Sequence, residues 1–245
     1  MAGQKPKLTP NDFDPEVLRL FDKYVHGGID RRGFLDGAAK FAVGGLTAAG
    51  LLEALSPKFA QAQQVPAADP RIKTQTIEFA SPKGYGKARG YLVRPANATG
   101  PLPTVLVVHE NRGLNPHIED ITRRLALDNF IAFAPDALFP LGGYPGDEDK
   151  ARELFGKLEQ PKTQEDFLAA AAYLKTVAGG NDERINAMWP PYEAALKAAN
   201  VKFEAVEYPG TQHGFNNDTT PRFDDKAAKA SWQRTVALFN STLRG

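Results

Sequence analysis

Short apolar runs alternate along the chain with longer stretches in which apolar residues recur at helical spacing. Residues 104–109 (TVLVVH) and 130–134 (FIAFA) are continuous apolar runs. Runs of this kind are typical of strands buried on both faces of a mostly parallel sheet. We therefore predict two buried strands, the first of them ending at His109.

Other segments alternate apolar with polar residues, which is the period of a strand with one buried face. Residues 76–79 and 90–93 do so on either side of a turn at residues 81–84 (SPKG), and they predict two antiparallel edge strands. Residues 201–208 (VKFEAVEY) alternate in the same way and predict a last strand.

Predicted helices lie between and after these strands. Asn115 and Pro116 supply an N-cap and a first-turn proline for the helix that follows residue 109. Residues 147–158, 163–177 and 192–199 also predict helices. The last helix carries apolar residues that step by four, three and four: Trp232, Val236, Phe239 and Leu243. This alternation of strand and helix predicts an α/β domain over residues 72–245, with a doubly wound, mostly parallel sheet in a three-layer α/β/α arrangement.

Residues 1–62 have the order of an export signal. Arg31 and Arg32 precede a weakly hydrophobic stretch at residues 41–52, and Ala60-Gln61-Ala62 supplies a small-x-small cleavage site. The arginine pair, with Phe34 and Leu35 after it, resembles a twin-arginine signal. The resemblance implies export of the folded protein to the periplasm or out of the cell, with cleavage after Ala62. Residues 63–71 would then be a mobile linker.

The alternative is that the arginine pair has no such role and that residues 31–55 form one ordinary amphipathic helix. Residues 15–24 predict a further short helix before them. The apolar stretch at residues 41–52 is too short for a membrane span, which needs roughly 18 apolar residues.

Composition excludes several classes of function. The 30 basic and 29 acidic residues nearly cancel, which argues against nucleic acid as a partner. The chain has no cysteine, so disulfides, thiolate metal sites and a cysteine nucleophile are excluded. Its four histidines are too dispersed for a metal cluster, and we expect neither a metal nor a cofactor.

Three loops at predicted strand or helix ends carry residues with chemistry: 109–114 (HENRGL), 179–182 (GGND) and 209–215 (PGTQHGF). Reactive groups of α/β sheets lie on the loops that leave the carboxyl ends of strands. An acid followed about 30 residues later by a histidine is the chain order of the α/β-hydrolase triad. Asp182 and His213 fit that order.

Together these loops resemble the dienelactone hydrolase family, through H-E-x-x-G, G-G-x-D and H-G-F, and the resemblance covers nearly all of residues 72–245. It implies an α/β-hydrolase that acts on a small carboxylic ester or lactone. By the same resemblance Asp182 orients the imidazole, His213 is general base and then general acid, and Glu110 is a buried carboxylate near the nucleophile.

Each of these residues also has a simpler interpretation. Asp182 could be a turn or N-cap residue, and His213 a surface histidine bonded to backbone. Glu110 could cap the next helix or pair with Arg112. His109 is expected to be a satisfied core or oxyanion-loop residue rather than a metal ligand.

The family's nucleophile has no counterpart here. It stands in a G-x-[CS]-x-G elbow between a strand and a helix, and no such motif occurs. The chain's serines lie elsewhere, in the leader, the edge turn and the final helix: Ser56, Ser81, Ser231 and Ser241. We therefore expect an inactive hydrolase.

The position of this absence indicates an internal deletion of roughly 50 to 70 residues, between about residues 177 and 179 of a domain of ordinary size. The lost segment would include central strands of the sheet. We therefore expect reduced stability, or homo-oligomers formed by strand pairing. Two other functions stay open: a non-catalytic binding protein on the same scaffold, and a metal hydrolase that uses His109, Glu110, Asp182 and His213.

The family's substrate-binding arginines are also absent from their usual places. Those places hold Pro140-Leu141 and Asn217. The resemblance therefore does not imply a preference for an anionic dienelactone.

Overall fold

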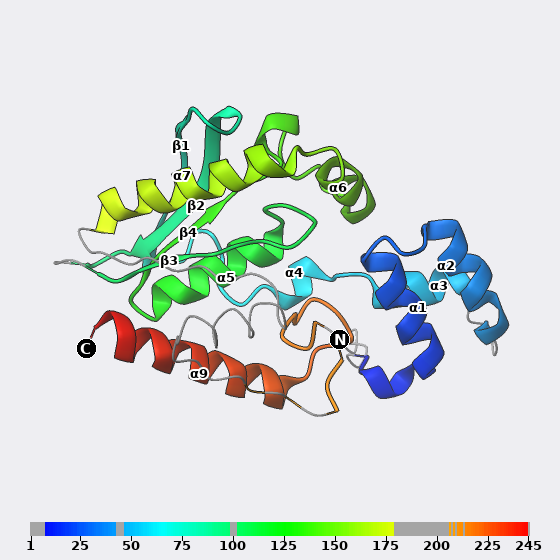
Figure 1. Ribbon diagram of the computed structural model, residues 1–245. Helices are drawn as coiled ribbons and strands as arrows, with labels where there is room; N and C mark the ends of the chain where they lie inside the picture. The colour runs from blue at the N-terminus through cyan, green and yellow to red at the C-terminus, as the bar shows by residue number, and fades with distance from the viewer. Residues whose placement is uncertain are drawn as a thin grey trace, which may run out of the picture.

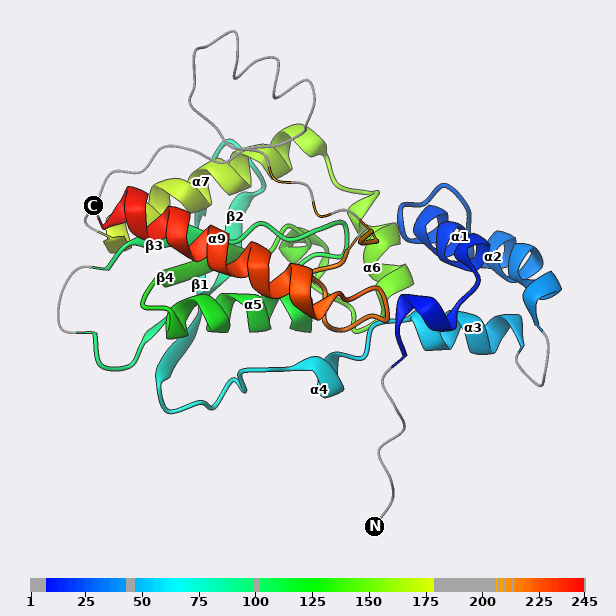
Figure 2. The ribbon, with the colours of Figure 1, turned by 90° about the horizontal axis from the view of Figure 1, so that it is seen from below.

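The computed structural model describes residues 8–42, 47–98, 102–178, 206, 208, 210–212 and 214–244. A mixed sheet lies between helices on both of its faces, and a separate group of helices from the N-terminal region packs at one end (Figures 1 and 2). The α/β fold class predicted from the sequence is confirmed. Of the predicted last strand at residues 201–208, the structure describes residues 206 and 208. The predicted helix at residues 192–199 lies outside the described residues.

The sheet begins with an antiparallel hairpin. Strand β1 (Ile72–Ser81) pairs with β2 (Gly86–Pro95), with Phe79 opposite Ala88, as the alternating pattern predicts. The prediction that both are edge strands is wrong for β2, because β2 also pairs antiparallel with β4 (Ile131–Pro135). Residues 91–93 of β2 are accordingly buried without alternation, as expected for a strand covered on both faces.

Strand β3 (Thr104–Leu106) pairs in parallel with β4, and the order of the described strands is β1-β2-β4-β3. One of these three pairings is parallel, so the described sheet is mixed rather than mostly parallel. Regular β3 is shorter than the predicted run. Pairing nevertheless continues for one residue, since the Val107 N–H donates to the Phe133 carbonyl at 2.8 Å.

Helix α5 (Pro116–Leu127) begins where the sequence predicts. The Asn115 side chain accepts from the Ile118 N–H at 3.1 Å, and Pro116 fills the first turn. The other described helices of the domain are α6 (Glu148–Phe155), α7 (Gln160–Ala178) and α9 (Asp225–Leu243), with a 3₁₀ turn η3 at Phe139–Leu141.

Each face of the sheet has its own core. Helices α5 and α9 cover one face, where the predicted stripe of α9 packs against buried residues of α5 and the strands. Helix α7 covers the other face. There Phe133 is fully buried, and its ring lies 5.7 Å from Phe79 and 5.5 Å from Tyr173. The sheet is thus fixed from both sides, which gives the loops at its ends a rigid base.

The N-terminal residues form four helices: α1 (Pro15–Val25), α2 (Arg31–Ala38), α3 (Ala48–Leu55) and α4 (Phe59–Ala62), with 3₁₀ turns η1 (Pro10–Asp12) and η2 (Ala39–Phe41). We call the described residues between 8 and 62 the N-terminal bundle. The described residues between 31 and 55 form α2 and α3, with η2 following α2, rather than one amphipathic helix. Helices α1, α2 and α3 share a core built around Phe21, Phe34 and Leu55.

None of the described helices has both the length and the apolar character that crossing a membrane requires.

The segment at residues 63–71 connects the bundle to β1 and is anchored on α5. The Val65 side chain is buried in the core beneath α5. The Val65 N–H donates to the Asp120 carboxylate at 2.8 Å, and the Arg123 guanidinium donates to the Val65 carbonyl at 2.6 Å. This expected linker is therefore held near its start, and its mobility after cleavage stays a prediction.

Because the bundle and the sheet have separate cores, we predict that damage to one leaves the other intact. Phe34→Ala should cost about 3–5 kcal/mol and raise hydrogen exchange in α1–α3, whereas Phe133→Ala should do so in β1–β4. Hydrogen exchange read by mass spectrometry measures both. Loss of protection throughout the chain in either variant would contradict independent cores.

Candidate functional site

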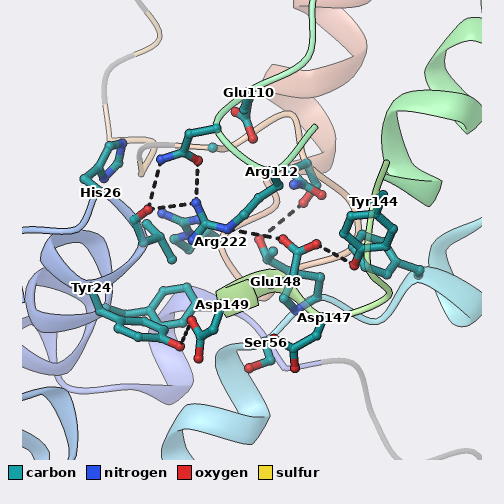
Figure 3. A pocket seen from close by; sticks show the side chains of 18 of the residues that line it. Tyr24, His26, Ser56, Glu110, Arg112, Tyr144, Asp147, Glu148, Asp149 and Arg222 are labelled. Atoms are coloured by element: carbon teal, nitrogen blue, oxygen red, sulfur yellow. Dashed lines mark hydrogen bonds and ion pairs between the residues drawn. The ribbon is translucent and has the colours of Figure 1, made fainter. Parts of the chain in front are cut away.

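A pocket of about 670 Å³ lies between the N-terminal bundle and the loops at one end of the sheet. Tyr24, His26 and Ser56 line it from the bundle. From the domain it is lined by the loop after β3, by the segment that opens α6, and by the loop before α9 (Figure 3). This volume is within the range that small-molecule sites occupy.

The loop after β3 is pinned by His109. Its Nδ1 lies 2.6 Å from the Glu110 carbonyl, and the Ala137 N–H donates to its Nε2 at 3.1 Å. The ring therefore carries its proton on Nδ1 and packs edge-on against Phe155 and Phe167. Burial lowers the pKa of His109. The expectation of a satisfied core histidine is confirmed.

Glu110 lies at the pocket, but the described residues leave its side chain exposed. Among the described residues Glu110 is thus exposed, and its role as a carboxylate near the nucleophile stays a prediction. The side chain lies apart from the network of contacts drawn in Figure 3. The expectation that it caps the next helix is also wrong, because Asn115 is the residue that caps α5.

Arg112 is buried and joins three parts of the pocket. It donates to the Val25 carbonyl at 2.9 Å and to the Asn111 side chain, and its Nε lies 3.6 Å from the Glu148 carboxylate. The Tyr144 hydroxyl donates to Glu148 at 2.8 Å. Burial raises the pKa of Glu148 and that of Tyr144, and it lowers the pKa of Arg112.

A second polar group lies nearer the bundle. The Tyr24 hydroxyl donates to Asp149, and Arg152 donates to the Tyr24 carbonyl. Burial raises the pKa of Tyr24 to about 12, and the hydrogen bond to Asp149 adds to the shift. Sequence reasoning missed Tyr24, because residues 1–62 were interpreted as an export signal. It also missed Tyr144 and Glu148, which belong to none of the motifs that the sequence offered.

The predicted acid and histidine, Asp182 and His213, lie outside the described residues. The neighbouring Gly214 and Asn217 line the pocket. The structure thus brings Glu110 and two residues that follow the predicted histidine, Gly214 and Asn217, to one pocket. The positions where the family carries arginines hold Pro140 and Leu141, both exposed, and Asn217.

All four serines are described. The Ser56, Ser231 and Ser241 hydroxyls donate to helix carbonyls three or four residues earlier. Ser81 is buried at the end of β1, before the hairpin turn. Each serine therefore lies in a helix, at a helix end or before a strand-to-strand turn.

A metal centre finds no support among the described residues. They contain no group of three or more His, Asp or Glu side chains that could hold a metal ion. His109, one of the ligands considered, uses both of its ring nitrogens in hydrogen bonds to the backbone.

A family model described as "Dienelactone hydrolase family" matches residues 88–188 and 174–243. The chain belongs to the dienelactone hydrolase family. A second model, "YqhI-like", matches residues 4–42, which include α1 and α2 of the N-terminal bundle.

Two relatives come from Escherichia coli K12. A protein named as a hydrolase fragment, YghX, is 54% identical over 109 residues, which is 44% of this chain and 93% of that protein. A protein named as a carboxymethylenebutenolidase is 26% identical over 253 residues, covering 71% of this chain and 93% of that protein.

Solved structures with this fold include a dienelactone hydrolase-type protein from Klebsiella pneumoniae, with a TM-score of 0.54 and 24% identity over 68% of this chain and 98% of that chain. Another, named m3DLH, has a TM-score of 0.56 and 16% identity, covering 71% of this chain and 99% of that chain. These likenesses agree with the α/β-hydrolase fold.

The lowered pKa of His109 predicts a pH dependence of stability. A folded pKa below the unfolded value means that the unfolded chain binds the proton more readily, so the free energy of unfolding falls as pH drops below about 6.5. The slope from one proton is at most about 1.4 kcal/mol per pH unit. His109→Gln should reduce this loss between pH 7 and 5 in urea unfolding. Equal pH profiles in the wild type and His109→Gln would contradict the assignment.

Proposed function

We propose that this chain is a dienelactone hydrolase-family protein whose pocket takes a small ester or lactone, and which does not turn that molecule over. One observation carries the proposal: in this cysteine-free chain, each of the four serines lies away from any strand-to-helix bend. The family's nucleophile needs such a bend to stand clear of the sheet and to receive a backbone N–H for its oxyanion.

Two comparisons support an internal deletion as the cause. The family model matches in two pieces that overlap at residues 174–188, and this overlap contains the proposed break near residues 177–179. The alignment with the 26% identical relative spans 253 residues although it uses 71% of this chain, about 174 residues. That relative therefore carries segments without a counterpart here.

Without a nucleophile, Asp182 and His213 would keep their places in the triad but have no hydroxyl or thiol to activate. Loss of a triad nucleophile costs about 10⁶ in kcat even in an intact fold. We predict that hydrolysis of p-nitrophenyl acetate, followed by absorbance, is equal in the wild type and in His213→Ala. A clearly faster wild type would refute inactivity.

The measured mass of the purified protein, compared with that of the 245-residue chain, shows whether the segment is absent from the molecule itself. A mass larger by tens of residues would remove the basis of the proposal.

A non-catalytic binding protein is the second candidate, favoured by the intact cores around a pocket of small-molecule size. Among the described strands β3 pairs with β4 alone, and Val108 just beyond it is 49% exposed. We propose that this edge pairs with a second copy of the chain. A defined oligomer in light scattering, with cooperative thermal unfolding, would support a binding protein. An aggregated or molten product would instead support a remnant of the hydrolase scaffold.

Export by the twin-arginine route is also proposed. Arg31 and Arg32 are exposed on α2, so a receptor could reach both guanidinium groups. We predict that Arg31→Lys with Arg32→Lys retains the protein in the cytoplasm, while the wild type reaches the periplasm and begins at Gln63. Cell fractionation and N-terminal sequencing check this, with Arg19→Lys on α1 as the matched control. A wild-type protein that stays in the cytoplasm with its N-terminus intact would contradict export.

A further inference from the structure

The carboxyl end of α1 is held by arginines of the hydrolase domain. Arg152 donates to the Tyr24 carbonyl and Arg112 to the Val25 carbonyl, the latter at 2.9 Å. Carbonyls in the last turn of a helix lack intrahelical partners, and this end of the helix dipole favours positive charge. These two contacts therefore place positive charge at the end of the helix that favours it, although the Tyr24 carbonyl also accepts from the Gly27 N–H at 3.0 Å. We call them the arginine clasp.

Other contacts across the same boundary are also polar or involve a cation. The Arg222 guanidinium lies 5.2 Å from the Phe21 ring centre and 3.5 Å from the Asp22 carboxylate. The Lys58 N–H donates to the Thr219 carbonyl at 2.6 Å. The bundle is thus attached to the domain largely by hydrogen bonds and charges, which water can replace.

The core of the N-terminal bundle is complete in itself. Its buried cluster draws on α1, α2 and α3 alone, and the clusters beneath α5 and α7 contain no residue of these helices. Separation of the bundle from the domain would therefore leave both cores covered. A unit of this kind can move as a rigid body when its boundary contacts break.

The boundary also contains the pocket. Tyr24, His26 and Ser56 form one wall, while Glu110, Arg112 and Glu148 belong to the opposite one (Figure 3). A molecule in the pocket would touch both the bundle and the domain. The pocket therefore has this shape while the bundle is docked.

We propose that in the full chain, which still carries residues 1–62, the N-terminal bundle is a cap that decides which molecules enter the pocket, and that the arginine clasp on the end of α1 holds it shut. Cleavage after Ala62 on export would remove this cap. A small molecule is admitted when the clasp opens, and an ester on a polymer or a folded protein is excluded. The inference rests on the pocket of the proposed function. Its test reads access to the pocket and the position of the cap rather than turnover, so the two can fail separately.

The absence of cysteine allows a direct test of access. Ser56→Cys places one thiol in the wall of the pocket, since Ser56 is partly buried there and its hydroxyl bonds within α3. Its reaction with iodoacetamide is followed by mass spectrometry in the full chain, alone and combined with Arg152→Gln. Arg94→Gln, the same change at an exposed position on β2, is the matched control.

We expect Arg152→Gln to speed the reaction at least about tenfold, as the loss of one charge-assisted hydrogen bond implies, and Arg94→Gln to change it less than about twofold. A maleimide on a polymer of about 5 kDa should react with the closed protein far more slowly than N-ethylmaleimide does, because the two reagents share one reactive group and differ in size. Equal iodoacetamide rates in all three proteins would overturn the proposal.

A second measurement distinguishes an open cap from an unfolded one. Spin labels at Asp36→Cys on α2 and Glu153→Cys on α6, both exposed, report the distance between bundle and domain. In Arg152→Gln the distance distribution should broaden to longer values while hydrogen exchange within α1–α3 stays protected. An unchanged distribution, or loss of protection in the bundle, would overturn a cap that opens as a unit.

Discussion

The position of the loop after β3 depends on His109, and the pocket depends on that loop. The His109 ring donates to the backbone of its own loop and accepts from Ala137, which lies just beyond β4. Two neighbouring strands of the sheet are thereby tied together at the point where both end. Because the sheet is covered on both faces, the loop has a rigid base, and the residues that follow His109 are presented to one side.

From that loop the polar contacts extend outward in order. Arg112 reaches Glu148 at the start of α6 and the end of α1 in the bundle, so one buried cation links three segments that are distant in sequence. Burial shifts the pKa of Arg112 and of Glu148 in opposite directions, each toward the neutral form. Such a pair is costly to bury unless both partners are held. The clasp on α1 helps to hold it, which connects the stability of the pocket to the docking of the bundle.

Membership of the dienelactone hydrolase family and the proposed lack of activity are compatible, because the fold and the reaction depend on different parts of the chain. The described strands and helices build a three-layer α/β arrangement with a pocket in the usual place, at the loops that leave the strands. Catalysis needs one further group at one bend. A pocket can therefore persist after the catalytic nucleophile is lost, and the binding of a small ester or lactone is then the property to measure.

The sequence by itself determined the elements and the family. Apolar periodicity located the hairpin, the strands β3 and β4 and the stripe of α9, and Asn115 with Pro116 marked the start of α5, because these signals act over a few residues. Tertiary structure alone decided that β2 is an interior strand, that Glu110 is exposed, and that the N-terminal bundle packs against the site. Those outcomes depend on which distant surfaces meet. The arginine clasp is the clearest case. Its acceptors are backbone carbonyls, which every residue carries, so the side chains at Tyr24 and Val25 give no sign of these hydrogen bonds.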